Sequence, residues 1–196
     1  MSLDKVSAAL KSRGFTVTCF ETKEEAADYL VSLFENEVIG IGGSHTIEEL
    51  DVYERLCEKN TVWWHKYDQR SRRMYGDFTA YLSSVNGVSE TGELVNIDGI
   101  GNRVASTIYG PKRVVFVVGR NKITPDLPSA MERAQKVAGP PNAKRLNKKT
   151  PCAVTGKCAD CRSPDRICGA MSIHMKPLNG FEKPEEIILI NEDLGY

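Results

Sequence analysis

The sequence has 196 residues, of which 41% are hydrophobic and 27% are charged, with 26 basic and 26 acidic side chains. This length fits one domain with a buried core, and the balanced charge leads us to expect neither a nucleic acid nor a membrane as partner. No stretch is apolar enough for a signal peptide or a membrane-spanning helix, so we expect a cytoplasmic protein.

The first third of the chain predicts alternating helices and strands. Thr22 and Glu25 have capping-box spacing at the start of one helix, and Thr46 and Glu49 have it at the start of another. Helical spacing of apolar residues and β-branched runs predict the other elements. The expected elements are a helix over 3–13 stopped by Gly14, a strand over 15–20, a helix from 22 to about 34, and strands over 38–41 and 61–65.

The middle of the chain contains many turn signals. Residues 69–82 are predicted to be largely helical, and short strands at 82–88 and 93–97 are separated by Asn-Gly and Thr-Gly turns, which favour hairpin-like pairing. The unbroken apolar run at 113–118 is typical of a strand buried on both faces of a parallel sheet. A helix over 125–138 follows, and we expect the Pro140-Pro141 pair to stop it.

This alternation through residue 138 predicts an α/β fold, Rossmann-like, with a mostly parallel sheet flanked by helices. After Pro141 the chain becomes basic and cysteine-rich, and strands are expected at 171–175 and 186–191. Because the last of these is too apolar for a free tail, we interpret residues 1–196 as a single domain in which residues 142–170 form a basic, cysteine-rich insertion.

A glycine-rich connection leads from an expected strand into a helix. It contains Gly42, Gly43, Ser44 and Thr46, and free backbone N–H groups at such a helix start can hold a phosphate or carboxylate. The spacing matches neither the Walker nor the dinucleotide pattern, and an ordinary turn with capping hydroxyls is the equal alternative. His45 is interpreted as a capping or solvated residue in preference to an acid or base.

A second polar cluster, NIDGIGNR, occupies residues 96–103, and Ser83, Ser84 and Asn86 precede it. It is too polar and too rich in glycine for a core strand. Asp98 could act as a base and Arg103 could hold an anion, whereas an Asp–Arg pair that fixes a turn is the equal alternative. Ligands of open α/β sheets bind beyond the carboxyl ends of the strands, so we expect this cluster and the glycine-rich connection to share one crevice.

Three stretches, GIGGSHTIEEL, SSVNGVSETGELVNIDGIGNRVAS and VVFVVGRNKI, together resemble the lactate-utilisation (LUD) domain family over about residues 1–140. The resemblance implies the fold of ribose-5-phosphate isomerases, glucosamine-phosphate deaminases and coenzyme A transferases. It also implies lactate or related organic-acid metabolism beside iron–sulfur redox proteins. It supplies no agreed nucleophile or base, so Asp98, Glu49 and Arg103 are catalytic candidates from their chemistry. The crevice positions that it implies are Gly42, Gly43, Ser44, Thr46, Glu49, Asn86, Asp98, Gly101, Asn102 and Arg103.

Four of the six cysteines follow the pattern C-x5-C-x2-C-x6-C, a departure from the plainest members of that family. Four thiolates suit a [4Fe–4S] cluster or a zinc ion, although the spacing matches neither a bacterial ferredoxin nor a zinc ribbon. Seven basic and two acidic residues between 142 and 168 would offset the negative charge of a cluster, so we favour iron–sulfur over zinc. A disulfide, a thiol switch and unliganded thiols remain alternatives. The cysteines are Cys152, Cys158, Cys161 and Cys168.

The remaining residues of interest have simpler interpretations. His174 is a possible substitute ligand, but its position in a strand pattern favours a side chain that faces solvent. Cys19 and Cys57 lie in apolar patterns and are interpreted as small core residues. Trp63 and Trp64 must point to opposite faces of their strand, so at least one of them is expected in the core.

The leading hypothesis is a protein that binds a small anionic metabolite and holds a metal centre near its crevice, for electron transfer if the centre is iron–sulfur. One alternative is a non-redox binding or regulatory module in which zinc stabilises the cysteine segment. Another, from fold analogy alone, is a sugar-phosphate isomerase-like enzyme with Asp98 or Glu49 as the base. The sequence names neither the metabolite nor the oligomeric state.

Overall fold

The computed structural model describes residues 3–68, 78–178, 180, 182–183 and 185–196. The helices are α1 (Leu3–Ser12), α2 (Lys23–Ser32), α3 (His45–Glu49), α4 (Tyr53–Cys57), α5 (Asn102–Ile108), the 3₁₀ turn η2 (Arg120–Lys122), α6 (Leu127–Glu132), the π-helical η3 (Arg133–Ala138), α7 (Gly139–Arg145) and α8 (Pro151–Thr155). The strands are β1 (Thr16–Phe20), β2 (Val38–Ile41), β3 (Thr61–Trp64), β4 (Ala80–Ser83), β5 (Gly87–Ser89), β6 (Leu94–Asp98), β7 (Arg113–Gly119), β8 (Ile123–Thr124), β9 (Ala170–His174) and β10 (Glu186–Ile190).

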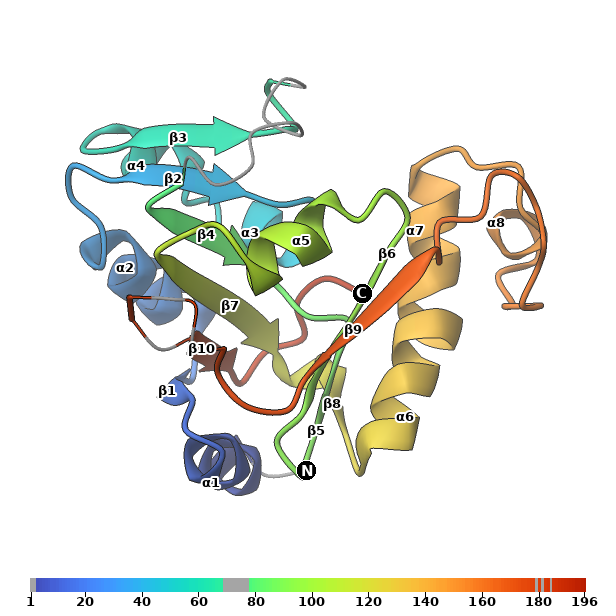
Figure 1. Cartoon of the computed structure of the whole chain (residues 1–196), viewed down its shortest axis with the longest axis horizontal. Helices are drawn as coiled ribbons and strands as arrows, with labels where there is room; N and C mark the ends of the chain where they lie inside the picture. The colour runs from blue at the N-terminus through green and yellow to red at the C-terminus, as the bar shows by residue number, and fades with distance from the viewer. Residues whose placement is uncertain (1–2, 69–77, 179, 181, 184) are drawn as a thin grey trace.

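A six-stranded sheet forms the centre of the molecule (Figure 1). Its strand order is β1-β10-β7-β4-β2-β3, and all five pairings are parallel. Side chains of β7 alternate between two cores. Val115 and Val117 pack with α2, α3 and α4, whereas Val114 and Phe116 face α1 and the second sheet. The predicted α/β fold with a mostly parallel sheet flanked by helices is therefore confirmed.

A second sheet has the order β8-β5-β6-β9 and stands beside the long helical stretch formed by α6, η3 and α7 (Figure 1). The predicted hairpin-like pairing is confirmed, since β5 and β6 are antiparallel, as are β6 and β9. Ala130 and Ala134 pack against Val95 in a small third core, which fixes the long helix against this sheet. The end of α7 and the cysteine segment consequently lie beyond the end of β6.

Two local signals act as predicted. Gly14 ends α1 with a φ of +98°, a value that favours glycine. The Thr22 side chain accepts from the Glu25 N–H while the Glu25 carboxylate accepts from the Thr22 N–H, so the first capping box is confirmed. In both places the signal and its partner lie within a few residues of each other.

The proposed stop at Pro140 and Pro141 is wrong, because helical structure runs from Leu127 to Arg145. The six residues before Gly139 are π-helical, and the two prolines occupy the first turn of α7. A π turn interrupts the regular i to i−4 bonds, so the missing proline N–H groups fall where that pattern is already broken. This longer helix carries Asn142 and Arg145 to the site described below.

The predicted helix over residues 69–82 is wrong at its end, and residues 69–77 lie outside the described part. Ala80 to Leu82 belong to β4, between β2 and β7, where Tyr81 and Leu82 pack into opposite cores. Pairing with two neighbouring strands decides this local structure, and a single sequence does not contain that information.

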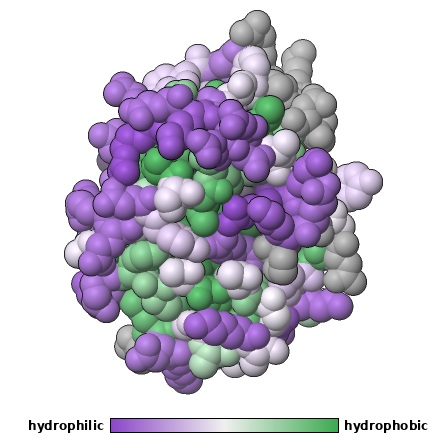
Figure 2. Space-filling model, turned by 90° about the vertical axis from the view of Figure 1, so that its left-hand side faces the viewer, coloured by the Kyte–Doolittle hydropathy of each residue, from purple (hydrophilic) through white to green (hydrophobic). Residues whose placement is uncertain are grey.

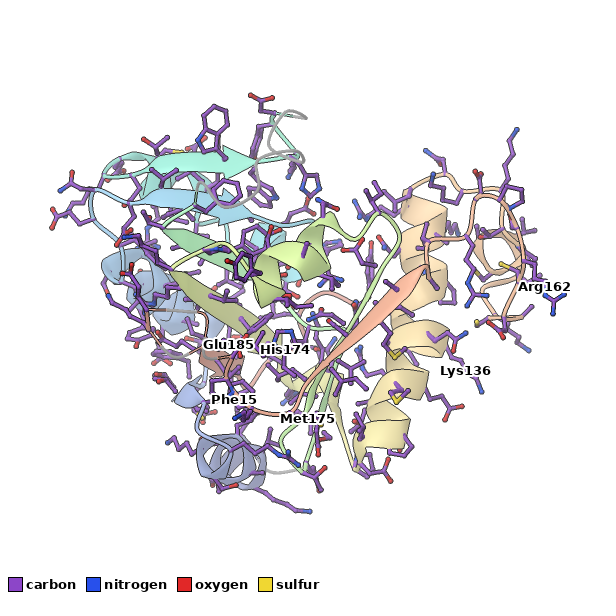
Figure 3. The ribbon with its side chains drawn as sticks, viewed as in Figure 1. Phe15, Lys136, Arg162, His174, Met175 and Glu185 are labelled. Atoms are coloured by element: carbon purple, nitrogen blue, oxygen red, sulfur yellow. The ribbon has the colours of Figure 1, made fainter. Side chains whose placement is uncertain are left out.

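Three predictions of burial need correction or confirmation. Cys19, on the edge strand β1, and Cys57, at the end of α4, are exposed, so neither is a core residue. His174 is buried and its Nδ1 lies 2.8 Å from Glu185 Oε1, so it does not face solvent (Figure 3). Trp64 is buried, as expected for one of the two tryptophans.

The face that carries α1, β1 and α2 is largely hydrophilic, with hydrophobic residues between the polar ones (Figure 2). Among the described residues, no helix combines the length and the apolar character that crossing a bilayer requires.

Candidate functional site

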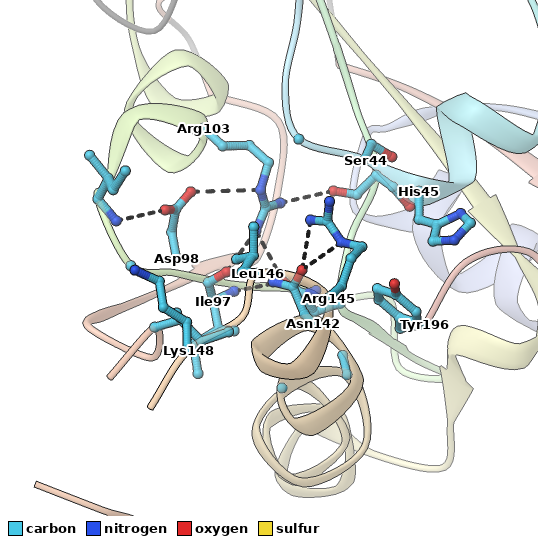
Figure 4. Close-up of a pocket in the computed structure, with 18 of the residues that line it drawn as sticks. Ser44, His45, Ile97, Asp98, Arg103, Asn142, Arg145, Leu146, Lys148 and Tyr196 are labelled. Carbon is cyan, nitrogen blue, oxygen red and sulfur yellow. Dashed lines mark hydrogen bonds and ion pairs between the residues drawn. The ribbon is translucent and has the colours of Figure 1, made fainter. Parts of the chain in front are cut away.

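A pocket of about 400 Å³ opens where the β2–α3 connection, the end of β6, the end of α7 and the cysteine segment meet (Figure 4). Of the residues predicted for the crevice, Gly42, Gly101 and Glu49 do not line it. The predicted residues that do line it are Gly43, Ser44, Thr46, Asn86, Asp98, Asn102 and Arg103. The two polar stretches of the sequence therefore meet at one pocket, and their role in binding stays a prediction.

The β2–α3 connection has a different cap from the predicted one. Ser44 caps α3 by accepting from the Ile47 N–H at 3.2 Å, so the predicted capping box of Thr46 and Glu49 is wrong. Glu49 Oε2 instead accepts from the Gly195 N–H at 2.9 Å, and its Oε1 lies 3.1 Å from His45 Nδ1. The helix begins two residues earlier than expected, which leaves the Thr46 hydroxyl available to a distant partner.

Glycine at position 42 is required by close packing. A Cβ at this position would lie 2.8 Å from the Tyr81 hydroxyl oxygen and 2.9 Å from Arg103 Cγ, which is closer than real contacts allow. Gly42 thus lets the Arg103 side chain pass against the backbone of the connection.

The Arg103 guanidinium holds three segments together. One terminal nitrogen donates to the Ser84 carbonyl and the Asn96 side chain, and the other donates to Asn86 Oδ1 at 3.1 Å and to the Ile97 carbonyl at 2.7 Å. Protein oxygens therefore occupy the donors of both terminal nitrogens. This geometry makes Arg103 a residue that positions the pocket wall, in preference to one that holds a ligand.

Asp98 completes that arrangement. Its Oδ1 accepts from the backbone N–H groups of Ile100 and Gly101 at 3.1 and 3.0 Å, and its Oδ2 lies 3.6 Å from Arg103 Nε. The pair fixes the turn that leads into α5, which is the structural alternative left open by the sequence.

Lys122 was missed by the sequence analysis. Its side chain is only 3% exposed, lines the pocket, and donates from Nζ to Thr46 Oγ1 at 2.6 Å and to Ser84 Oγ at 2.7 Å. Among the described residues it forms no ion pair with a carboxylate. The available signal was its position, three residues after the end of the buried strand β7, at the carboxyl edge of the sheet.

The electrostatic surroundings of Lys122 are unusual for a lysine. Burial, together with the charges of Arg133 and Arg103, lowers the pKa of Lys122 from 10.5 to about 7; burial contributes most, and the charge of Glu49 opposes the shift. Arg133 is itself buried, and within the described part of the chain it donates to the backbone oxygens of Asn121, Asn86 and Tyr196. The structure thus places three cations close together with few anions.

Three further cations line the rim. Arg145, at the end of α7, donates to Asn142 Oδ1, and Lys148 follows it in the chain (Figure 4). Arg166 comes from the cysteine segment, where it donates to the backbone carbonyls of Cys161 and Cys168 at 2.7 and 2.9 Å and forms an ion pair with Asp160 at 2.8 Å. The sequence had indicated a basic segment here, and the fold turns part of it toward the pocket.

All four clustered cysteines line a second, smaller cavity of about 20 Å³, and Arg166 and Ile167 line both cavities. Burial raises the pKa of the Cys168 thiol; the Arg166 charge opposes this, and each of the other three sulfurs raises it further, so the four sulfurs are near neighbours. Among the described residues, however, no group of three or more His, Cys, Asp or Glu side chains has the geometry to hold a metal ion.

The proposed insertion of residues 142–170 and its metal stay predictions.

A parallel sheet flanked by helices, with a polar pocket at the carboxyl ends of its strands, places the protein in the large class of open α/β folds, in which that edge is the usual ligand site. The chain belongs to the LUD domain family, whose model matches residues 3–190. The resemblance noted in the sequence is therefore confirmed.

The fold is also similar to the crystal structure of a DUF162 family protein from Deinococcus radiodurans. The two chains are 12% identical, the TM-score is 0.55, and the match covers 96% of this chain and 95% of the other. At this identity the similarity shows the fold alone. A search of curated proteins gives no match.

Proposed function

We propose that this LUD domain protein binds a small anionic metabolite, a carboxylate of the lactate type, in the pocket beside α7. The observation that carries the proposal is Lys122, a buried cation in the pocket wall without a carboxylate partner among the described residues. A buried charge of this kind is costly unless an opposite charge accompanies it or the group loses its proton.

The charges that line the pocket support an anion. Five basic side chains line it against two acidic ones, Asp98 and Asp165. Asp98 is engaged by Arg103 and by backbone N–H groups, and Asp165 Oδ2 accepts from the Lys149 N–H at 2.9 Å. The basic side chains are Arg103, Lys122, Arg145, Lys148 and Arg166. This excess of positive charge favours one carboxylate or phosphate group on the ligand.

The proposal includes a [4Fe–4S] cluster held by the four clustered cysteines, which would supply one-electron chemistry next to the pocket. Three features support it: the shared cavity of the four sulfurs, the basic residues around them, and the two residues that line both cavities. Iron–sulfur redox proteins would then be the partners. We place this chemistry in the cytoplasm, where thiols stay reduced. A structural zinc is the alternative for the same residues.

Anion binding is tested by titrating the purified protein with lactate, pyruvate and inorganic phosphate in a calorimeter at pH 7. We expect at least one of these anions to bind, and Arg145→Ala and Lys148→Ala each to weaken binding about tenfold, the loss of one charge-assisted contact. Arg162→Ala is the control, because Arg162 projects away from the molecule on the cysteine segment and does not line the pocket (Figure 3). Equal affinity in all these proteins, or no binding, would contradict the proposal.

The metal is tested by purification without exposure to air, followed by iron, sulfide and zinc analysis. The wild-type protein should contain iron and sulfide, and the double variant Cys158→Ser, Cys161→Ser should lose both. Cys19→Ser removes an exposed thiol on β1, away from the cluster, and should retain the metal. Stoichiometric zinc would favour the structural alternative. A protein that contains neither iron nor zinc would refute a metal centre.

A further inference from the structure

We propose that Lys122 forms an imine with the bound anion, through a carbonyl group that the anion carries next to its carboxylate, as in a 2-oxo acid. The inference rests on the proposed anion binding and assigns the reactive atom of the site to Lys122 Nζ. Anionic ligands without a carbonyl group would bind in the same pocket but would not react.

The hydrogen bonds of Lys122 leave its lone pair free for this reaction. The Thr46 hydroxyl lies 3.4 Å from the Leu194 carbonyl, and the Ser84 hydroxyl lies 3.4 Å from the Val85 carbonyl. Each hydroxyl has one hydrogen, which it donates to that carbonyl, so each accepts from Lys122. A neutral amine has two N–H bonds, and both are used in this way. The lone pair of the nitrogen is therefore not used by these hydrogen bonds and can attack a carbonyl carbon in the pocket.

The surroundings favour the neutral amine that the reaction needs. Because burial and the nearby charges of Arg133 and Arg103 bring the pKa of Lys122 to about 7, about half of the amine is neutral at pH 7. An ordinary lysine with a pKa near 10.5 is neutral in only about one molecule in three thousand at this pH. Lysines buried in this manner are the nucleophiles of many imine-forming sites.

The pocket also contains cations that can bind the carboxylate of the ligand. Arg145, at the end of α7, and Lys148, just after it, line the pocket from a different segment than the Thr46 and Ser84 hydroxyls that hold Lys122. A small 2-oxo acid can thus present its carboxylate to these two cations and its carbonyl carbon to the amine. This division of roles explains why one pocket contains a buried lysine and several rim cations.

The reaction is balanced without an oxidant or a reductant. Lys122 Nζ attacks the carbonyl carbon, a C–N bond forms, and the carbonyl oxygen receives the proton that the nitrogen loses. The resulting hydroxyl group takes up the second amine proton and leaves as water, and a C=N bond results; hydrolysis reverses both steps. While it lasts, the imine withdraws electrons from the neighbouring carbon, so the C–H bonds of that carbon become more acidic.

The experiment traps the imine in the wild-type protein. The full chain is incubated with pyruvate or glyoxylate, treated with borohydride, digested, and mapped by mass spectrometry. We expect one reduced adduct on Lys122 and about tenfold less on Lys112, an exposed lysine paired with Glu182 outside the pocket. An excess of lactate, which has a carboxylate but no carbonyl, should prevent the labelling of Lys122.

Variants complete the test. Lys122→Met should lose the dominant adduct, whereas Lys112→Met should retain it. Because the adduct is mapped in the wild-type chain, the result does not depend on whether the variants fold. If neither oxo acid labels Lys122, or if lactate leaves the labelling unchanged, the imine is refuted. Lactate binding in the calorimeter without any adduct refutes the imine alone, whereas no binding of any anion together with no adduct refutes the proposed function as well.

Discussion

Replacing Lys122 with methionine should stabilise the protein at and below neutral pH, although the lysine makes two hydrogen bonds. A pKa of about 7 in the folded chain against 10.5 in the unfolded chain corresponds to a destabilisation of about 5 kcal/mol when both states are protonated. Methionine fills a similar volume without a charge. The Thr46 and Ser84 hydroxyls each lose a donor, at about 1 kcal/mol each. The net gain is about 3 kcal/mol.

The sign of this effect depends on pH. Because the folded pKa lies below the unfolded one, the unfolded chain binds more protons between pH 7 and 10.5, so wild-type stability rises with pH across that window. The charged groups that act on Lys122 are Arg133 and Arg103, which lower its pKa, and Glu49, which raises it. The advantage of Lys122→Met should therefore be full below pH 7, shrink above it, and change sign as the pH approaches 10.5.

The assay is urea unfolding of wild type, Lys122→Met and Lys112→Met at pH 6, 8 and 9.5. The free-energy difference between wild type and Lys122→Met should fall steadily with pH, whereas Lys112→Met, which alters an exposed lysine, should show little change at any pH. A difference that stays constant with pH, or a Lys122→Met variant less stable than wild type at pH 6, would refute the reasoning.

Two further predictions concern stability. Glu185→Gln weakens the buried pair with His174, so we expect the free energy of unfolding to fall by about 3 kcal/mol in thermal unfolding. The control Glu182→Gln alters an exposed residue and should change little. Equal melting temperatures for the two variants would contradict the pairing. Gly42→Ala should cost about 2 kcal/mol and weaken anion binding, because its Cβ has no room. Gly139→Ala should be tolerated, because the nearest atom to its Cβ would be Cys168 Sγ at 3.7 Å; calorimetry and urea unfolding of both variants check this.

Residues near the pocket show where sequence reasoning stops. The glycine-rich connection and the NIDGIGNR stretch stood out because their composition is unsuited to a core strand, and both reach the pocket. Lys122 did not stand out, because a single lysine after a strand is ordinary in a sequence. Its partners Thr46 and Ser84 lie 76 and 38 residues away along the chain, and only the fold brings the three together.

The sequence by itself determined the elements whose signals are local or whose burial is complete. The apolar runs of β7 and β10 predicted strands, and that of β7 a strand buried on both faces. The Thr22 capping box and Gly14 marked helix ends, because there the interacting groups are neighbours in the chain. Only the tertiary structure decided that Ser44 caps α3, that helical structure continues past Pro140, and that His174 is buried. Those outcomes depend on burial and on partners from distant segments, and their free energies exist only once the chain has folded.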